Sequence, residues 1–131
     1  MLNGYAYITV LVSNQDQALK FYQESLGFEL RMDVPFSPEQ RWVTVAPVGM
    51  DYPEISLDMA ASESQKNAVG KQAGDTALLV LTTENADQTY ADFKAKGVEL
   101  LGEPENMPWG RQFYLKDLYG NSISVLQPAP R

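Results

Sequence analysis

Residues 10–30 read "VLVSNQDQALKFYQESLGFEL", and this stretch passes from an apolar strand through a capped helix into a second strand. Asn14 is a favourable N-cap residue, and Gln17 stands three positions later, as in a capping box. Gly27 follows the apolar positions of the helix and predicts its end. The positions that recur at helical spacing along one face are Ala18, Leu19, Tyr22 and Leu26.

The second half of the chain repeats this order. Asn85 is again a cap with Gln88 three residues on, and the "GVEL" at 97–100 echoes the "GFEL" at 27–30. A repeat of element order, caps and stops predicts an α+β fold of two tandem β-α-β-β-β modules, residues 1–59 and 75–131, in one domain spanning 1–131. We expect strands at 5–12, 28–34, 41–47, 54–59, 75–81, 98–103, 111–117 and 122–127, and a loop at 35–40.

The polar segment 60–74 lies between the two modules. Its composition predicts a linker, and a lid over a binding site is the functional alternative, because long loops in compact domains often carry function.

The composition restricts the function. The chain has 131 residues, no cysteine, no histidine and a net charge of −7, which rules out thiolate metal sites and a Ser-His-Asp triad and argues against nucleic-acid binding. The acidity favours cationic ligands, although it also serves solubility. With no apolar run of ~20 residues and no basic leader, we expect no membrane contact and a cytoplasmic location.

Two stretches carry a family resemblance: "KFYQESLGFE" at 20–29 and "LKDLYGNSIS" at 115–124, where Leu118 replaces the family's usual proline. The chain resembles the glyoxalase / bleomycin-resistance / extradiol-dioxygenase superfamily, also called the vicinal oxygen chelate fold. The resemblance implies that each module forms a half-cup and that two half-cups make an eight-stranded cup. It also implies a homodimer, with or without exchange of modules between subunits.

The metalloenzymes of this superfamily place histidine and glutamate ligands on the first and last strands of each module. By resemblance these positions are Tyr7, Ser56, Asp75 and Ser124, with Asp58 replacing Ser56 if the register shifts. Only the aspartates are ordinary metal ligands. We therefore expect no metal and no cofactor.

The alternation of side chains along a strand adds Thr9 and Ser122 to the predicted lining, and the tryptophans could supply aromatic walls. Arg41 and Arg111 occupy equivalent places in the repeat; they either face the cup or form ion pairs on the outside. The predicted ligand-binding residues are Tyr7, Thr9, Trp42, Ser56, Asp58, Asp75, Trp109, Arg111, Ser122 and Ser124.

The leading hypothesis is a metal-free protein that binds a small cationic or aromatic molecule, in the manner of a sequestration or resistance protein. The alternative is a lyase or dioxygenase-type enzyme using the same cup; a metal-free enzyme would use Asp75 as general base and Tyr7 as proton donor. A third hypothesis is an interaction module with an empty cup.

Overall fold

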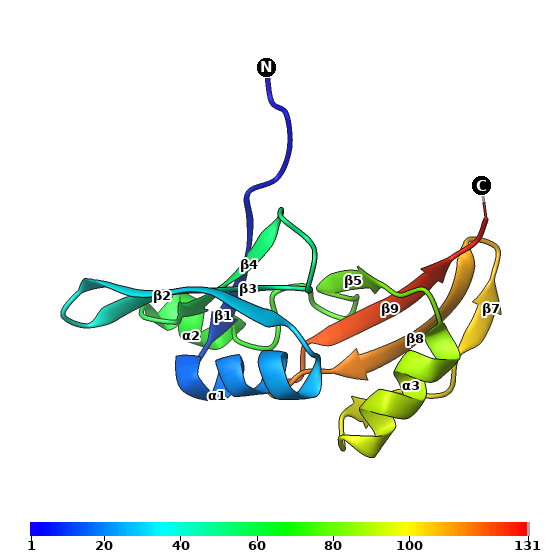
Figure 1. Cartoon of the computed structure of the whole chain (residues 1–131). Coiled ribbons are helices and arrows are strands. Elements are labelled where there is room, and N and C mark those ends of the chain that lie inside the picture. The colour runs from blue at the N-terminus through cyan, green and yellow to red at the C-terminus, as the bar shows by residue number, and fades with distance from the viewer. Residues whose placement is uncertain (131) are drawn as a thin grey trace. The chain divides into compact units, whose positions relative to one another are not determined.

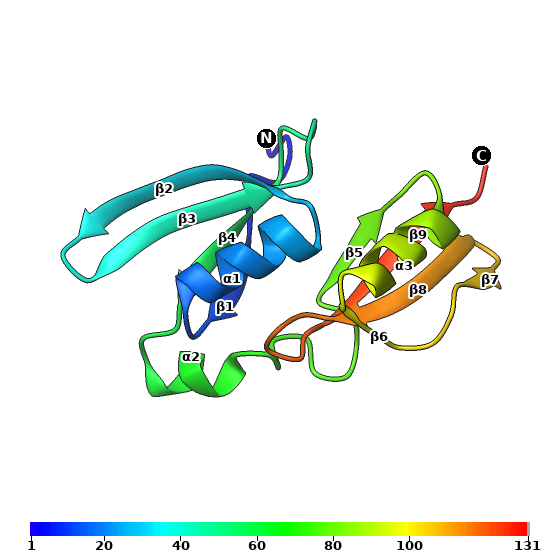
Figure 2. The ribbon, with the colours of Figure 1, turned by 60° about the horizontal axis from the view of Figure 1, so that its bottom comes forward.

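The computed structural model describes residues 1–130. The chain forms two compact units, Met1–Gly70 and Lys71–Arg131. Each unit consists of a β-sheet with one face covered by a helix (Figure 1). Figure 2 shows α1 (Gln15–Lys20) lying over the sheet of the first unit, and α3 (Ala86–Ala95) lying over the sheet of the second.

Both sheets have the same strand order around a parallel pair. The first sheet is ordered β1-β4-β3-β2 and the second β5-β9-β8-β6, with β7 also paired to β8. The first unit contains β1 (Tyr7–Val12), α1 (Gln15–Lys20), β2 (Glu29–Ser37), β3 (Gln40–Ala46) and β4 (Glu54–Met59). The second contains β5 (Leu79–Thr82), α3 (Ala86–Ala95), β6 (Glu99–Leu100), β7 (Glu105–Met107), β8 (Gly110–Lys116) and β9 (Ser122–Pro128).

The α+β class and the tandem β-α-β-β-β modules are confirmed. The described residues form nine strands rather than eight, because the second strand of the second module is divided into β6 and β7. Gly102, with φ +88°, lies between these two pieces and turns the chain.

The helix caps read from the sequence are present. The Asn14 side chain accepts a hydrogen bond from the backbone N–H of Gln17 at 2.9 Å, and Asn85 accepts one from Gln88 at 3.0 Å. After Lys20, α1 continues as a π-helical turn, Phe21–Ser25. Each helix therefore begins at a fixed residue, directly after its capping asparagine.

The core of each unit lies between helix and sheet. Val10 and Val12 of β1 are fully buried in the first unit, as is Tyr22 at the end of its helix. In the second unit, the ring of Phe113 contacts the rings of Tyr90 and Phe93, with centroids 5.4 and 6.2 Å apart. Since side chains alternate along a strand, the intervening residues occupy the opposite face, which we call the open face of each sheet.

The expected loop at 35–40 is wrong. β2 continues through Pro35 to Ser37, and β3 begins at Gln40. Pro35 is tolerated because β2 is the edge strand of its sheet, where a missing N–H costs no ladder hydrogen bond. The β2–β3 hairpin is consequently longer than the sequence indicates.

Two further boundaries differ from expectation. β5 begins at Leu79, because the preceding residues form hydrogen-bonded turns, among them Thr76 N–H to Ala73 carbonyl. The segment 60–74 contains a helix, α2 (Glu63–Ala68), with a reciprocal capping box between Ser62 and Gln65.

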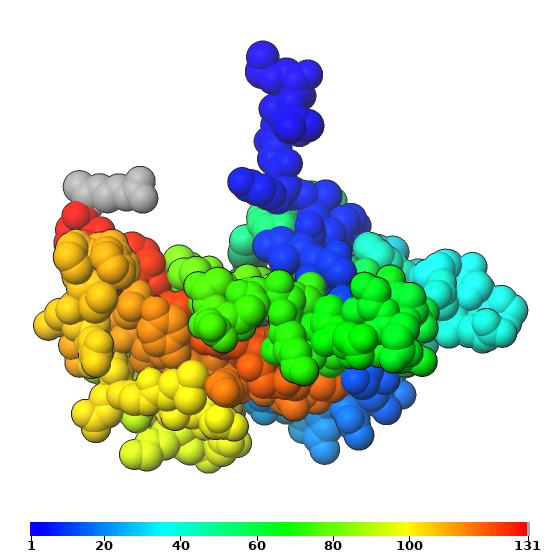
Figure 3. Space-filling model, turned by 180° about the vertical axis from the view of Figure 1, so that it is seen from behind, coloured from blue at the N-terminus to red at the C-terminus, as the bar shows by residue number. Residues whose placement is uncertain are grey.

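Residues 1–6 project from the first unit and add nothing to its core (Figure 3); Met1 and Leu2 are almost fully exposed. No helix among residues 1–130 is long and apolar enough to cross a membrane.

Candidate functional site

The open face of the first sheet carries a row of hydroxyl side chains. Thr9 of β1 pairs with Ser56 of β4, which pairs in turn with Thr44 of β3. The rings of Tyr7 and Trp42 meet edge to face across β4, with centroids 5.1 Å apart. An edge-to-face contact of this kind contributes beyond the apolar area that the two rings bury.

A pocket of about 300 Å³ opens on this face beside the aromatic pair. This volume is at the lower end of the range for small-molecule sites. Its walls come from β1, the β2–β3 hairpin, the end of β4, α2 and the segment that leads into α2. The lining residues are Thr9, Leu11, Phe36, Gln40, Arg41, Trp42, Asp58, Met59, Ala61 and Gln65.

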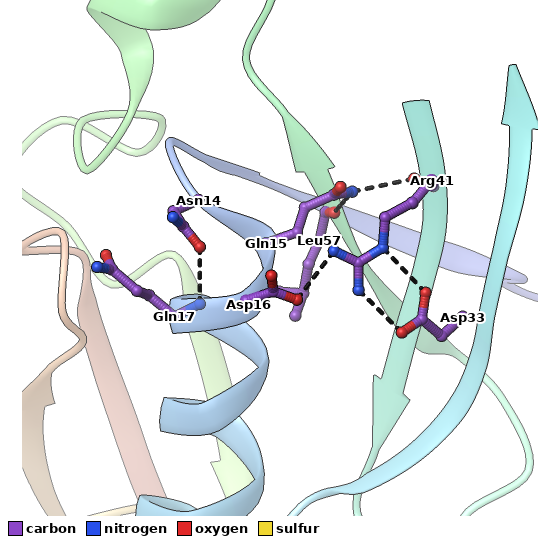
Figure 4. A network of polar contacts seen from close by, with 7 residues as sticks. All are labelled: Asn14, Gln15, Asp16, Gln17, Asp33, Arg41 and Leu57. Atoms are coloured by element: carbon purple, nitrogen blue, oxygen red, sulfur yellow. Dashed lines mark hydrogen bonds and ion pairs between the residues drawn. The ribbon is translucent and has the colours of Figure 1, made fainter. Parts of the chain in front are cut away.

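The pocket lies where β3 and β4 separate. These strands pair only at Thr44–Ser56 and Val45–Ile55. Beyond Ser56, the side chain of Gln15 enters the gap from the start of α1 (Figure 4); its Nε2 donates hydrogen bonds to the carbonyls of Arg41 at 3.0 Å and Leu57 at 2.9 Å.

Asp58 is the carboxylate of the pocket. It is half-buried at the end of β4. Among the described residues, no hydrogen bond or ion pair engages its carboxylate, whereas Asp33 and Asp16 of the same unit both pair with Arg41. A partly desolvated carboxylate without a counterion favours a cation.

Arg41 is ion-paired on the helix-covered side. Its guanidinium donates to both carboxylate oxygens of Asp33, at 3.1 and 2.9 Å, and to Asp16 at 2.9 Å (Figure 4). The hydrogen bond from Arg41 lowers the pKa of Asp33, and the hydrogen bonds to Asp33 and Asp16 raise the pKa of Arg41. The side chain therefore ties β3 to β2 and α1.

Arg111 has the same arrangement in the second unit. It donates to Asp87 of α3, with a shortest distance of 2.9 Å, and to Asn106 at 2.9 Å. The hydrogen bond to Asp87 raises the pKa of Arg111. Because Arg111 alternates with Gln112 and pairs with Gln127, it lies on the face opposite Ser124. The structure does not bring Arg111 together with the predicted serines.

Trp109 does share the open face of the second sheet. Its indole N–H donates to the side chain of Gln112 at 2.8 Å, and Gln112 donates to the hydroxyl of Tyr114 at 3.2 Å. Tyr114 pairs with Ser124, and Lys116 with Ser122. Gln112 and Tyr114 were not predicted from the sequence, although the spacing of alternate residues along 111–117 is the signal that identifies them.

Asp75 does not occupy the position expected of it. It lies exposed in a turn before β5. Thr9 pairs with Ser56 and Val80 pairs with Ser124, so the residue that matches Tyr7 in the second unit is Leu78. The sequence alignment of the two first strands was therefore shifted by three residues, because the turn residues at 75–77 resemble the start of a strand.

The side chains at the expected metal positions do not fit a divalent cation. Ser56 and Ser124 are neutral and buried, at 1% and 3% exposure, and Tyr7 is packed on Trp42. Within residues 1–130, no three or more His, Cys, Asp or Glu side chains are grouped so that they could hold a metal ion.

Of the predicted residues, the pocket of the first unit contains Thr9, Trp42 and Asp58, and the aromatic contact adds Tyr7. Gln65 and Met59 are among the lining residues that were not predicted from the sequence. For Gln65, the signal was the lid alternative for segment 60–74, since α2 follows directly on the pocket wall.

Comparison with known proteins finds a family model and relatives that match nearly the whole chain. The family model described as "Glyoxalase/Bleomycin resistance protein/Dioxygenase superfamily" matches residues 4–125. YetH, an uncharacterized protein from Bacillus subtilis (strain 168), is 35% identical over 126 residues, covering 92% of this chain and 95% of its own.

Two solved structures are also similar. UcmS2 is 31% identical with a TM-score of 0.86, covering 97% of this chain and 99% of its own. TnmS3, described as an antibiotic binding protein from Streptomyces sp. CB03234, is 34% identical with a TM-score of 0.77, covering 98% of both chains.

Proposed function

The chain belongs to the Glyoxalase/Bleomycin resistance protein/Dioxygenase superfamily, and we propose that within it this protein binds a small organic molecule without using a metal, as a sequestration or resistance protein does. The observation that carries the proposal is the pocket beside Trp42, with the unpaired carboxylate of Asp58 in its wall. An antibiotic-binding protein among the similar structures supports the same class of function.

The lining indicates the chemistry of the ligand. Phe36 and Trp42 offer aromatic surface, and Leu11 and Met59 offer aliphatic surface. Asp58 supplies a negative charge beside these apolar surfaces, where an organic cation is attracted both by the carboxylate and by the aromatic faces. We therefore propose a ligand with a flat aromatic body and a positively charged group.

A fluorescent pyridinium dye tests this proposal directly. We would titrate the protein with 4-(4-dimethylaminostyryl)-N-methylpyridinium and, separately, with its neutral parent lacking the N-methyl group. We expect the cation to bind more tightly, and Asp58→Asn to weaken its binding by about tenfold or more, the loss typical of a desolvated charge pair. Asp51→Asn, which removes the same charge from an exposed loop, is the matched control.

Equal binding of the two dyes, or equal affinity in wild type and Asp58→Asn, would show that the carboxylate is not the recognition group. Absence of any binding would reject this ligand class.

The enzyme alternative requires a metal or a base. Calorimetric titration with Ni²⁺, Zn²⁺, Mn²⁺ and Fe²⁺ addresses the first, and we expect no stoichiometric binding because the donor set is poor. Tight binding that Asp75→Ala or Asp58→Ala abolishes would replace our proposal with a lyase or dioxygenase. A homodimer and a cytoplasmic location remain predictions, the first measurable by sedimentation.

A further inference from the structure

We propose that Gln15 is the positioning residue of the pocket: its carboxamide holds β3 and β4 at the separation that places Trp42 and Asp58 for ligand binding. This inference concerns the pocket of the proposed function, but the position of Trp42 can be measured without any ligand.

The geometry connects Gln15 to both pocket residues through single peptide groups. One nitrogen, Nε2, donates to the carbonyls of Arg41 and Leu57 at 3.0 and 2.9 Å. Each of these carbonyls belongs to the planar peptide group whose N–H is that of Trp42 or Asp58. The two hydrogen bonds therefore fix the orientation of the backbone immediately before each pocket residue.

No hydrogen bond between β3 and β4 fixes the backbone at these two positions, because the strands have already separated there. Their last pair before the gap is Thr44–Ser56. Gln15 is only 4% exposed, so water has little access to take its place, and a buried carbonyl without a donor is costly. Within residues 1–130, the Gln15 side chain thus links the two strands at the level of the pocket.

The start of α1 fixes Gln15 in turn. Asn14 caps the helix through the N–H of Gln17, so Gln15 is the first helical residue and its side chain is directed toward the sheet (Figure 4). Its equivalent in the second unit, directly after the cap Asn85, is Ala86. Alanine cannot bridge two strands, and there the corresponding strands β8 and β9 stay paired along their whole length.

The test uses 5-fluorotryptophan in the full-length protein, because the chain has two tryptophans and each gives one ¹⁹F resonance. Trp42→Phe identifies the signal of Trp42. In Gln15→Leu, which keeps the bulk and removes both donors, we expect the Trp42 signal to shift and broaden while that of Trp109 stays unchanged. The affinity for the pyridinium dye should fall about tenfold, as expected when two buried hydrogen bonds are lost.

Gln127→Leu is the matched control. Gln127 accepts a hydrogen bond from the N–H of Ala86 at 2.9 Å, so this variant removes a helix-to-strand contact from the second unit. It should leave the Trp42 signal and dye affinity as in wild type.

A second variant keeps the test decisive if Gln15→Leu does not fold. In Gln15→Glu, an ionised carboxylate would face two carbonyl acceptors, and only its protonated form can donate a hydrogen bond. The Trp42 signal should therefore return toward the wild-type position as the pH is lowered from 8 to about 5, since apposed acceptors raise a carboxyl pKa. Wild type over the same pH range is the control for the other carboxylates around this junction, those of Asp16, Asp33 and Asp58.

An unchanged Trp42 signal in both variants would overturn the proposal, even if thermal stability falls, because Gln15 would then only stabilise the fold. A displaced Trp42 signal in a protein whose wild type binds no dye would uphold the role of Gln15 and reject the ligand class instead.

Discussion

The two units share one plan, but their central strand pairs differ. In the second unit β8 and β9 pair continuously from Gly110–Pro128 to Lys116–Ser122. In the first unit β3 and β4 pair only at Thr44–Ser56 and Val45–Ile55, and then diverge. The difference shows how a duplicated sheet can gain a pocket: the ladder is released at one end, and a side chain from the helix replaces the lost backbone partners.

The glutamines illustrate the change. In the first unit, Gln15 reaches from the helix to two strand carbonyls. In the second, Gln127 reaches from the strand to the first N–H of the helix, at Ala86. A glutamine side chain thus donates hydrogen bonds to an opened sheet in one unit, and another accepts one from the start of a helix above a continuously paired sheet in the other.

The residue before each of the two equivalent arginines, Arg41 and Arg111, gives the test with the largest expected effect on stability. Gly110 of β8 has φ +147°, and a Cβ there would lie 2.2 Å from the carbonyl oxygen of Gln127. In the first unit the equivalent residue is Gln40, whose side chain lines the pocket. Glycine is required only where the strands remain close.

We therefore expect Gly110→Ala to lower the free energy of unfolding by about 3 kcal/mol or more, since a backbone clash adds to the strain of the positive φ. Urea unfolding measures the loss. Gly102→Ala is the control, because Gly102 also has a positive φ, +88°, but open space around it; its loss should be about 1–2 kcal/mol. Equal losses would mean that the close approach of β8 and β9 is unimportant.

The repeat, the caps and the strand order could be predicted from the sequence, because each depends on local patterns that are visible in both halves. The divergence of β3 from β4 could not. It depends on Gln15 being buried and turned toward Arg41 and Leu57, which are 26 and 42 residues away. A glutamine after an N-cap ordinarily reads as an exposed helix residue.

The error at Asp75 has a different cause. "DTALLVL" begins with turn residues that continue smoothly into apolar ones, so periodicity could not locate the start of β5 at Leu79. Only the pairing of Val80 with Ser124 sets the register. Asp58 was named as an alternative to Ser56, and both are on the open face, one of them in the pocket wall.

The two equivalent arginines give a test with a smaller expected effect on the free energy of unfolding. Arg41 joins two carboxylates, on β2 and α1, whereas Arg111 joins one carboxylate and one amide. Arg41→Leu should cost about 1 kcal/mol of unfolding free energy, as a network of partly exposed ion pairs does. Arg111→Leu should cost less.

Urea titrations in low salt and at 1 M NaCl separate the electrostatic part, because screening weakens exposed pairs. If Arg111→Leu lowered the free energy of unfolding more than Arg41→Leu does, the second carboxylate bound by Arg41 would not make its network the more stabilising of the two.

The pH dependence of the Arg41 contact is the finest test of the difference between the units. The hydrogen bond from Arg41 holds the pKa of Asp33 below its ordinary value. A depressed pKa means that the folded state prefers the ionised carboxylate, so its contribution to stability is complete above the unfolded pKa of about 3.9 and is lost as the pH falls through the lower folded value.

We expect wild type to be slightly more stable than Asp33→Asn from pH 5 to 7, with the two converging below about pH 4. Chemical unfolding of both proteins across this range measures the gap, which 1 M salt should narrow because the Asp33 side chain is 32% exposed. A gap that stays constant down to pH 2.5 would show that Asp33 supports β3 through packing and not through its charge.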